Sequence, residues 1–224
     1  MADPEKVEEV YRKYVDRFPH FRDDIVLERP FPFERYKVHE DWEPKSVRLL
    51  FLAESPPWNC PENYFYNREY QGNLSHGVFG LLNIKGTSKC CQLHEFKDRG
   101  YFLVDTVMCV VKKTEDAPIP KSLVRCSGEH VLRSEIERIS PKCILVLGSS
   151  ALAGLKRFEP YKSRLARVTH IADEKEDGKI AAVKPITWEK TGVVVSPFPN
   201  NRNRDKWSAV ECAFREAVNI AGEK

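Results

Sequence analysis

The chain has 224 residues, of which 42% are hydrophobic, and this is enough for one compact domain with a sizeable core. Its formal net charge of +3 is too small to demonstrate nucleic-acid binding, although it permits a local basic face. No stretch approaches the ~20 apolar residues of a membrane span, and the first residues lack a signal pattern. We therefore expect a cytoplasmic monomer with no membrane partner.

Apolar runs alternate with helical patterns along the chain, which is typical of an α/β sheet. An amphipathic helix is predicted over 4–18, followed by an irregular segment rich in Pro and aromatic residues over 20–45. We treat 1–45 as an arm of a single domain spanning 1–224. A strand over 47–53 then leads into a long aperiodic segment, 54–75, and loops of that length are usually functional.

The remaining elements repeat this alternation. Gly100, Pro141 and Gly148 mark ends of elements, Ser149 or Ser150 is expected to cap one helix, and Asp205 is expected to cap the last helix. The pattern predicts a three-layer α/β/α fold with a mainly parallel central sheet of about four strands. The predicted elements are helices at 76–84, 88–98, 121–139 and 150–157, strands at 101–104, 143–147 and 193–195, an edge strand near 180–183, and a final helix carrying Trp207 to Ala221.

Three of these strands stop abruptly at polar or Pro-rich residues. The first runs into Glu54-Ser55-Pro56-Pro57, the second into Asp105, and the third into Ser196-Pro197-Phe198-Pro199. Open α/β sheets bind ligands outside the carboxyl ends of their strands. We therefore expect these three loops to converge on one site.

The middle of the chain makes this arrangement more specific. The run Tyr101 to Cys109 is followed by a basic, Pro-containing connection, a helix, Pro141-Lys142, and a strand that ends at Leu147-Gly148. Together with the first and last loops, this order resembles the uracil-DNA glycosylases, most closely the thermophilic-type, family-four branch. The resemblance covers about 47–155 and 192–220.

The resemblance implies a role for the first loop. The family uses a carboxylate, a Pro and backbone amides there, for the base and the attacking water; Glu54, Ser55 and Pro56 stand at those places. Ser55 replaces an Ala of the family, and Pro57 replaces a Gly and lacks the N–H that the Gly would donate. Alternatively, Glu54 is a solvated loop residue or a helix-capping carboxylate.

A flipped base also needs an aromatic surface on which to stack. The family takes this ring from the segment after the first loop, where Phe65, Tyr66 and Phe79 are the main candidates, with Tyr64 beside them. Phe79 has an equal alternative, because it could pack in the core with its helical neighbours.

Two departures from the family bear on which base is recognised. Asp105 stands where the family places the Asn that reads uracil, and an ionised Asp only accepts hydrogen bonds. It would repel O4 of uracil and favour an edge bearing an amino group, unless strong desolvation kept it protonated. Ser196 stands where the family has a His that donates to the leaving base, and losing one such donor costs about 10²–10³-fold in rate. Alternatively, Asp105 only accepts from loop amides.

The last loop continues with residues suited to DNA. Phe198, Asn200, Asn201 and Arg202 could enter the base stack or bind phosphates. Alternatively, 200–205 is a polar turn before the final helix.

The sequence predicts no cofactor. Family-four enzymes hold an iron–sulfur cluster through four cysteines, but this chain has no CxxC pair, and only Cys109 and Cys126 lie near the family's ligands. Several cysteines lie in apolar runs and fit reduced core positions, and the six histidines show no metal-ligand spacing.

Two functions stay open at this point. One is a DNA glycosylase that hydrolyses the N-glycosidic bond of a flipped, damaged or deaminated base, with altered base preference. The other is a non-catalytic relative that binds nucleic acid or nucleotides. The expected partner is DNA, single- or double-stranded, or a free base or nucleotide.

Overall fold

A five-stranded sheet with the order β3-β2-β5-β9-β8 forms the centre of the protein. The computed structural model describes residues 3–113, 118–165, 175–176, 179–180, 186–188, 191–199 and 206–222. Four strands are parallel, namely β2 (Leu49–Ala53), β3 (Tyr101–Asp105), β5 (Cys143–Leu147) and β9 (Thr191–Ser196). The edge strand β8 (Ile186–Trp188) is antiparallel to β9. The expected α/β class and mainly parallel sheet are confirmed.

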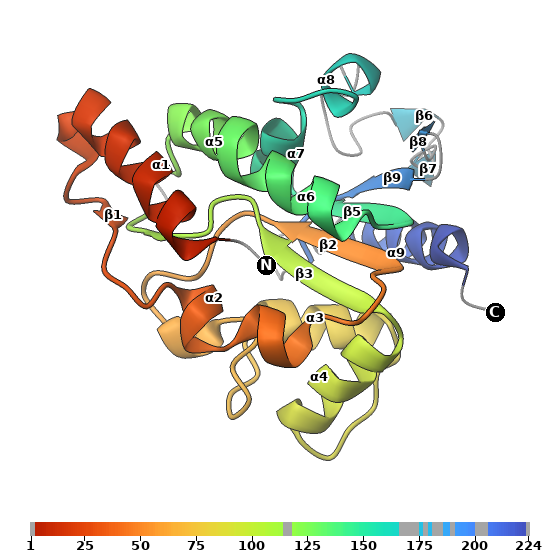
Figure 1. Cartoon of the computed structure of the whole chain (residues 1–224). Coiled ribbons are helices and arrows are strands. Elements are labelled where there is room, and N and C mark those ends of the chain that lie inside the picture. Colours follow the sequence, from red (N-terminus) through yellow and green to blue (C-terminus); the bar gives the residue numbers. More distant parts are fainter. Residues whose placement is uncertain are drawn as a thin grey trace.

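Helices cover both faces of this sheet (Figure 1). One layer contains α1 (Pro4–Arg17), α5 (Lys121–Ser127), α6 (Arg133–Ile139) and α7 (Ser149–Leu155). The other contains α3 (Asn73–Leu81), α4 (Lys89–Asp98) and α9 (Trp207–Ala221). The smaller elements are α2 (Pro32–Arg35), α8 (Tyr161–Arg164), the 3-10 turns Pro19–Phe21 and Pro61–Asn63, the π turns Val38–Trp42 and Gly128–Leu132, and two ribbons, β1 (Ile25–Val26) with β4 (Val110–Val111) and β6 (Lys175–Glu176) with β7 (Lys179–Ile180).

The strands form because their side chains are apolar on both faces. Every residue of β2, β3 and β5 is buried, which is the pattern of parallel strands covered by helices on both sides. Phe51 of β2 shows the packing of one layer, since its ring lies 5.3 Å from that of Phe96 in α4 and 5.7 Å from that of Phe214 in α9.

The N-terminal helix follows from its sequence. The Asp3 side chain accepts hydrogen bonds from the N–H groups of Glu5 and Lys6, and so caps α1. Its apolar face is buried at Val7, Tyr11, Tyr14 and Val15. Nothing in the described helices is both long and apolar enough to cross a membrane.

Several element boundaries differ from the prediction. The helix expected over 121–139 contains a π turn at Gly128–Leu132, where Gly128 lies so close to the backbone of α7 that an added Cβ would come within 2.5 Å of the Gly154 carbonyl oxygen. The cap of α7 is Gly148, at φ 89°, and neither Ser149 nor Ser150 caps the helix with its side chain. Part of the edge strand expected near 180–183 and the expected cap Asp205 lie outside the described residues.

Candidate active site

The strand register brings the predicted loops to one edge of the sheet. Ala53 pairs with Asp105, so Glu54 leaves β2 beside the end of β3. Leu147 pairs with Ser196, which ends β9. In the order β3-β2-β5-β9, Asp105 and Ser196 are three strand spacings apart, or about 14 Å.

The end of β3 is fixed to the end of β2 by hydrogen bonds beyond the sheet. Thr106 donates to the Ala53 carbonyl oxygen twice, from its backbone N at 2.9 Å and from its Oγ1 at 2.7 Å. Val107 N donates to the Glu54 carbonyl oxygen at 2.9 Å. The backbone that carries Glu54 and Asp105 is therefore held in one conformation before any ligand arrives.

Two other segments hold the carboxylate of Glu54. Ser150 of α7 donates to Glu54 Oε1 at 2.6 Å, and Lys113 forms an ion pair with Glu54 Oε2. Lys113 also donates to Ser55 Oγ at 3.3 Å. The Glu54 side chain keeps 28% of its surface exposed, so water reaches the carboxylate.

Asp105 has a very different environment. It is only 7% exposed and receives a hydrogen bond from the Tyr64 hydroxyl. Burial raises the pKa of Asp105 to about 7; the nearby Glu54 also raises it, while the Lys113 ammonium and the Tyr64 hydrogen bond oppose the shift. This carboxyl group is therefore present in both protonation states near neutral pH.

The aromatic candidates lie in the core. Phe65, Tyr66 and Phe79 are each at most 2% exposed. The rings of Phe65 and Phe79 are 5.5 Å apart, and the Lys89 ammonium lies 4.9 Å from the Phe79 ring. Stacking a base on any of these rings requires movement of their neighbours.

The hydroxyl groups of Tyr66 and Tyr64 bind different residues. The Tyr66 hydroxyl accepts from Leu103 N at 2.7 Å and donates to Leu103 O at 3.0 Å, so it satisfies the outer edge of β3. Tyr64 is the candidate that contacts Asp105, and its ring lies 5.1 Å from that of Tyr36 in the N-terminal arm. A cavity of about 60 Å³ adjoins these two rings and is lined also by Pro56, Pro57 and Arg35.

The last loop turns inward. Ser196 is fully buried, and its hydroxyl donates to the Pro197 carbonyl oxygen at 2.9 Å. Phe198 is partly buried and packs against the core near Gly148. The predicted DNA contacts Asn200, Asn201 and Arg202 lie outside the described residues.

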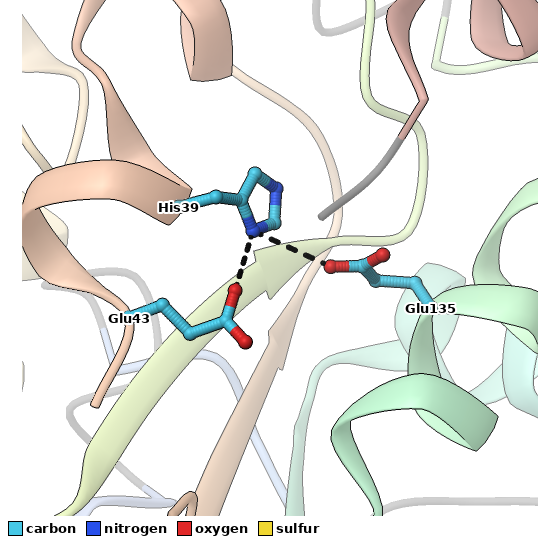
Figure 2. A group of neighbouring side chains, drawn as sticks. All are labelled: His39, Glu43 and Glu135. Atoms are coloured by element: carbon cyan, nitrogen blue, oxygen red, sulfur yellow. Dashed lines mark hydrogen bonds and ion pairs between the residues drawn. The ribbon is translucent and has the colours of Figure 1, made fainter. Parts of the chain in front are cut away.

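A second polar group, His39, Glu43 and Glu135, lies where the N-terminal arm meets α6 (Figure 2). His39 Nδ1 is 2.8 Å from Glu43 Oε2 and 3.5 Å from Glu135 Oε1. These are potential metal ligands, but Arg138 binds both carboxylates, each at 2.6 Å. Burial alone would raise the pKa of Glu43, yet hydrogen bonds from His39 and Arg138 lower it to about 2. The group is therefore an ion-pair network that already contains its cation.

The cysteines show no pairing in the structure. All seven are free thiols; Cys109 is buried and Cys126 half-buried. Burial raises the pKa of both thiols, which disfavours the thiolate form that binds metals. The absence of an iron–sulfur cluster stays a prediction.

The sequence does not predict the contacts that three residues make at this site. Lys113 lies in the basic connection after Cys109, the position of Ser150 predicts a helix cap, and Tyr64 is one of several candidate rings. One signal was available for Ser150, because it follows the end of β5 as Glu54 follows the end of β2. No comparable signal marks Lys113.

The fold and this edge of the sheet define an α/β protein with a carboxylate site at its strand ends. Residues 41–221 match the model of the uracil DNA glycosylase superfamily. The match spans more than half of the 224 residues, and the chain belongs to this superfamily. A search of curated proteins gives no significant match. Membership supports glycosylase-like chemistry on DNA.

Proposed function

We propose that the protein is a monofunctional DNA glycosylase that hydrolyses the N-glycosidic bond of a flipped, damaged or deaminated base. The observation that carries this proposal is the group of Glu54, Lys113, Ser150 and Asp105, held together at the ends of β2, β3 and β5. Such a reaction needs a carboxylate beside the sugar and polar groups beside the base.

The proposed reaction gives Glu54 and Lys113 different roles. Water attacks C1′ of the sugar while the bond to the base breaks, and the base leaves with the electron pair. Glu54, whose two oxygens are fixed by Ser150 and Lys113, orients this water, accepts its proton and faces the cationic sugar. Ser196 replaces the family's His, which donates to the leaving base. In this proposal Lys113 supplies positive charge near the negatively charged leaving base instead.

Asp105 reads the edge of the base, and Tyr64 orients Asp105 through its hydrogen bond. Tyr64 also lines the cavity beside Pro56, and this cavity is where part of the base would enter. In this proposal Phe65, Tyr66 and Phe79 support the pocket from behind, because their rings are buried among one another.

The second candidate is a non-catalytic DNA-binding relative. One observation favours it, namely that the Ser196 hydroxyl is fully buried and already bound to Pro197. In that state Ser196 makes no contact with a leaving base, and the pocket would bind a base without releasing it.

Base release decides between the two candidates. Duplexes with uracil, hypoxanthine or xanthine are incubated with the protein, and free base and abasic sites are measured in single-turnover reactions. Release of any base that falls at least about 100-fold in Glu54→Gln supports the glycosylase. Glu137→Gln is the matched control, since Glu137 forms a surface ion pair with Arg133. Tight binding to these duplexes without release of any base supports the second candidate.

A further inference from the structure

Trp58 is an exposed aromatic residue in the same loop as Glu54. It is 37% exposed, and among the described residues the only other large hydrophobic side chain that is classed as exposed is Tyr70, at 50%. An indole ring that water can reach can also stack on a base, so this Trp in the loop that carries Glu54 is a candidate contact for DNA.

Two consecutive lysines contact the first part of the loop that carries Trp58. Lys113 binds Glu54 and Ser55, and the Lys112 ammonium lies 5.2 Å from the centre of the Trp58 ring. The backbone of Lys112 is itself fixed, since its N–H donates to the Asp24 carbonyl oxygen at 2.7 Å. Trp58 is thus placed at a defined position relative to the carboxylate, with a cation on its ring.

This pair has the chemistry of a DNA contact. Extruding a nucleotide leaves neighbouring bases without a stacking partner, and proteins that distort DNA insert apolar side chains at such steps. An aromatic ring stacks on any base, and an adjacent ammonium binds phosphate.

We propose that Trp58 and Lys112 form a duplex-DNA contact beside the base pocket. The indole stacks on a base left exposed when the target nucleotide leaves the helix, and the Lys112 ammonium binds the neighbouring phosphate. This inference rests on the proposed function for the location of the flipped nucleotide, but the contact itself is a property of binding.

The test measures the affinity of the full chain for a duplex with a stable abasic-site analogue, by fluorescence anisotropy at several salt concentrations. Trp58→Ala should weaken binding roughly 5- to 100-fold, and Trp58→Phe should retain most of the affinity. Lys112→Met should lower the slope of log affinity against log salt by about one. Tyr70→Ala is the matched control and should bind like the unchanged protein.

A second measurement covers the case in which Trp58→Ala does not fold. Addition of the duplex should quench tryptophan fluorescence in the unchanged protein, and this quenching should shrink in Trp58→Phe. Unchanged quenching in Trp58→Phe, with an unchanged salt slope in Lys112→Met, would overturn the contact.

Failure of this inference is distinguishable from failure of the proposed function. If bases are released while Trp58→Ala binds as tightly as the unchanged protein, the contact is wrong and the glycosylase stands. If no base is released but Trp58→Ala still weakens binding, the contact stands without the enzyme.

Discussion

Asp105 shows how much a residue's chemistry depends on its burial. As an ionised group it would reject O4 of uracil, because a carboxylate has no hydrogen to donate. Burial, however, raises the pKa of Asp105 to about 7. A protonated carboxyl group donates one hydrogen bond and accepts another, as the amide of Asn does. The exclusion of uracil that is expected from the sequence thus applies only to the ionised form.

The first prediction concerns the pH dependence of base choice. Below a pH of about 7 Asp105 is mostly protonated, so uracil release should rise as the pH falls through this value. Asp105→Asn should remove this dependence and raise uracil release at pH 8. Single-turnover release from a G·U duplex between pH 6 and pH 8.5 provides the measurement. Robust release that Asp105→Ala leaves undiminished would show that another residue reads the base.

The second prediction couples Asp105 to Ser196. Ser196→His should restore a donor to the leaving base and is expected to raise uracil release by up to about 10²-fold. The double change with Asp105→Asn should exceed either single change, because the two groups act on one base. The four proteins are compared in the same single-turnover assay. If the double variant releases uracil no faster than the faster of the two single variants, Asp105 and Ser196 do not act on the same base.

The third prediction concerns Lys89, whose ammonium is buried between the rings of Phe65 and Phe79. Its Nζ makes no hydrogen bond within the described part of the chain, and burial lowers its pKa from 10.5 to about 7. The folded protein therefore holds fewer protons than the unfolded chain between these values, so this residue makes stability rise with pH.

Lys89→Met should remove this contribution. Its free energy of unfolding should exceed that of the unchanged protein at pH 6, and the difference should shrink by roughly 2 kcal/mol at pH 9. Urea unfolding at both pH values checks this, with Lys85→Met, an exposed position, as the control. A difference that stays constant between the two pH values would mean that folding does not lower the pKa of Lys89 and that the residue is protonated in both states.

At this scale the sequence identifies some site residues and not others, for physical reasons. Glu54 and Asp105 are predictable because they follow apolar strands, and the ends of parallel strands share one edge. The role of Lys113 is not predictable from the sequence, because the tertiary fold determines which residue a flexible side chain in an aperiodic loop contacts. Whether Phe79 is a platform or a core residue is likewise decided by its neighbours in space.

At the scale of elements, α1 does more than cover the sheet. The hydroxyl of Tyr11 accepts from Met108 N at 2.8 Å and lies 2.8 Å from Ser127 Oγ, which donates to Thr106 O at 2.6 Å. One buried side chain of the N-terminal arm thus joins α5 to the backbone that follows Asp105. The arm is part of the support of the site.

The fourth prediction follows from this connection. Tyr11→Phe leaves the buried Met108 N–H without its acceptor and should destabilise the protein by about 1–3 kcal/mol. Tyr14→Phe is a matched control with a smaller expected cost, because its partner Ser122 is only part-buried. Chemical denaturation of both variants is the measurement. If both variants lose the same free energy of unfolding, the hydrogen bond from Met108 N to Tyr11 does not contribute to stability.

Element types were more predictable than element ends. The core of each parallel strand was located from the sequence because a run of buried aliphatic residues has few alternatives. The π turn at Gly128–Leu132 is not predictable from the sequence, since it depends on the close approach of α7. The strand β8 is not predicted, because the charged segment around it carries no clear period.

At the scale of the whole molecule, periodicity predicts strands and helices but leaves the order of the strands undetermined. The order β3-β2-β5-β9 places Glu54 between Asp105 and Ser150. The general position of ligands at the carboxyl ends of parallel strands predicts that these loops meet, and the family match over residues 41–221 agrees with that expectation.

The fifth prediction concerns cofactors. A [4Fe–4S] cluster needs four ligands, and only Cys109 and Cys126 lie near the family's positions, both with raised pKa values. Freshly purified protein should therefore show no iron by elemental analysis and no absorbance band at about 400 nm. A stoichiometric iron content would contradict this prediction.

The position of β9 has a consequence for how the site is made. Most of the candidate site, including Glu54, Asp105, Lys113 and Ser150, comes from the first two thirds of the chain, and only Ser196 comes from β9. During synthesis β2, β3 and β5 can therefore pair before β9 leaves the ribosome. Until then the apolar strand β5 has an unpaired edge, which is the kind of surface that recruits other chains. Insertion of β9 covers this edge, so we expect the nascent protein to be most prone to aggregate before β9 is inserted.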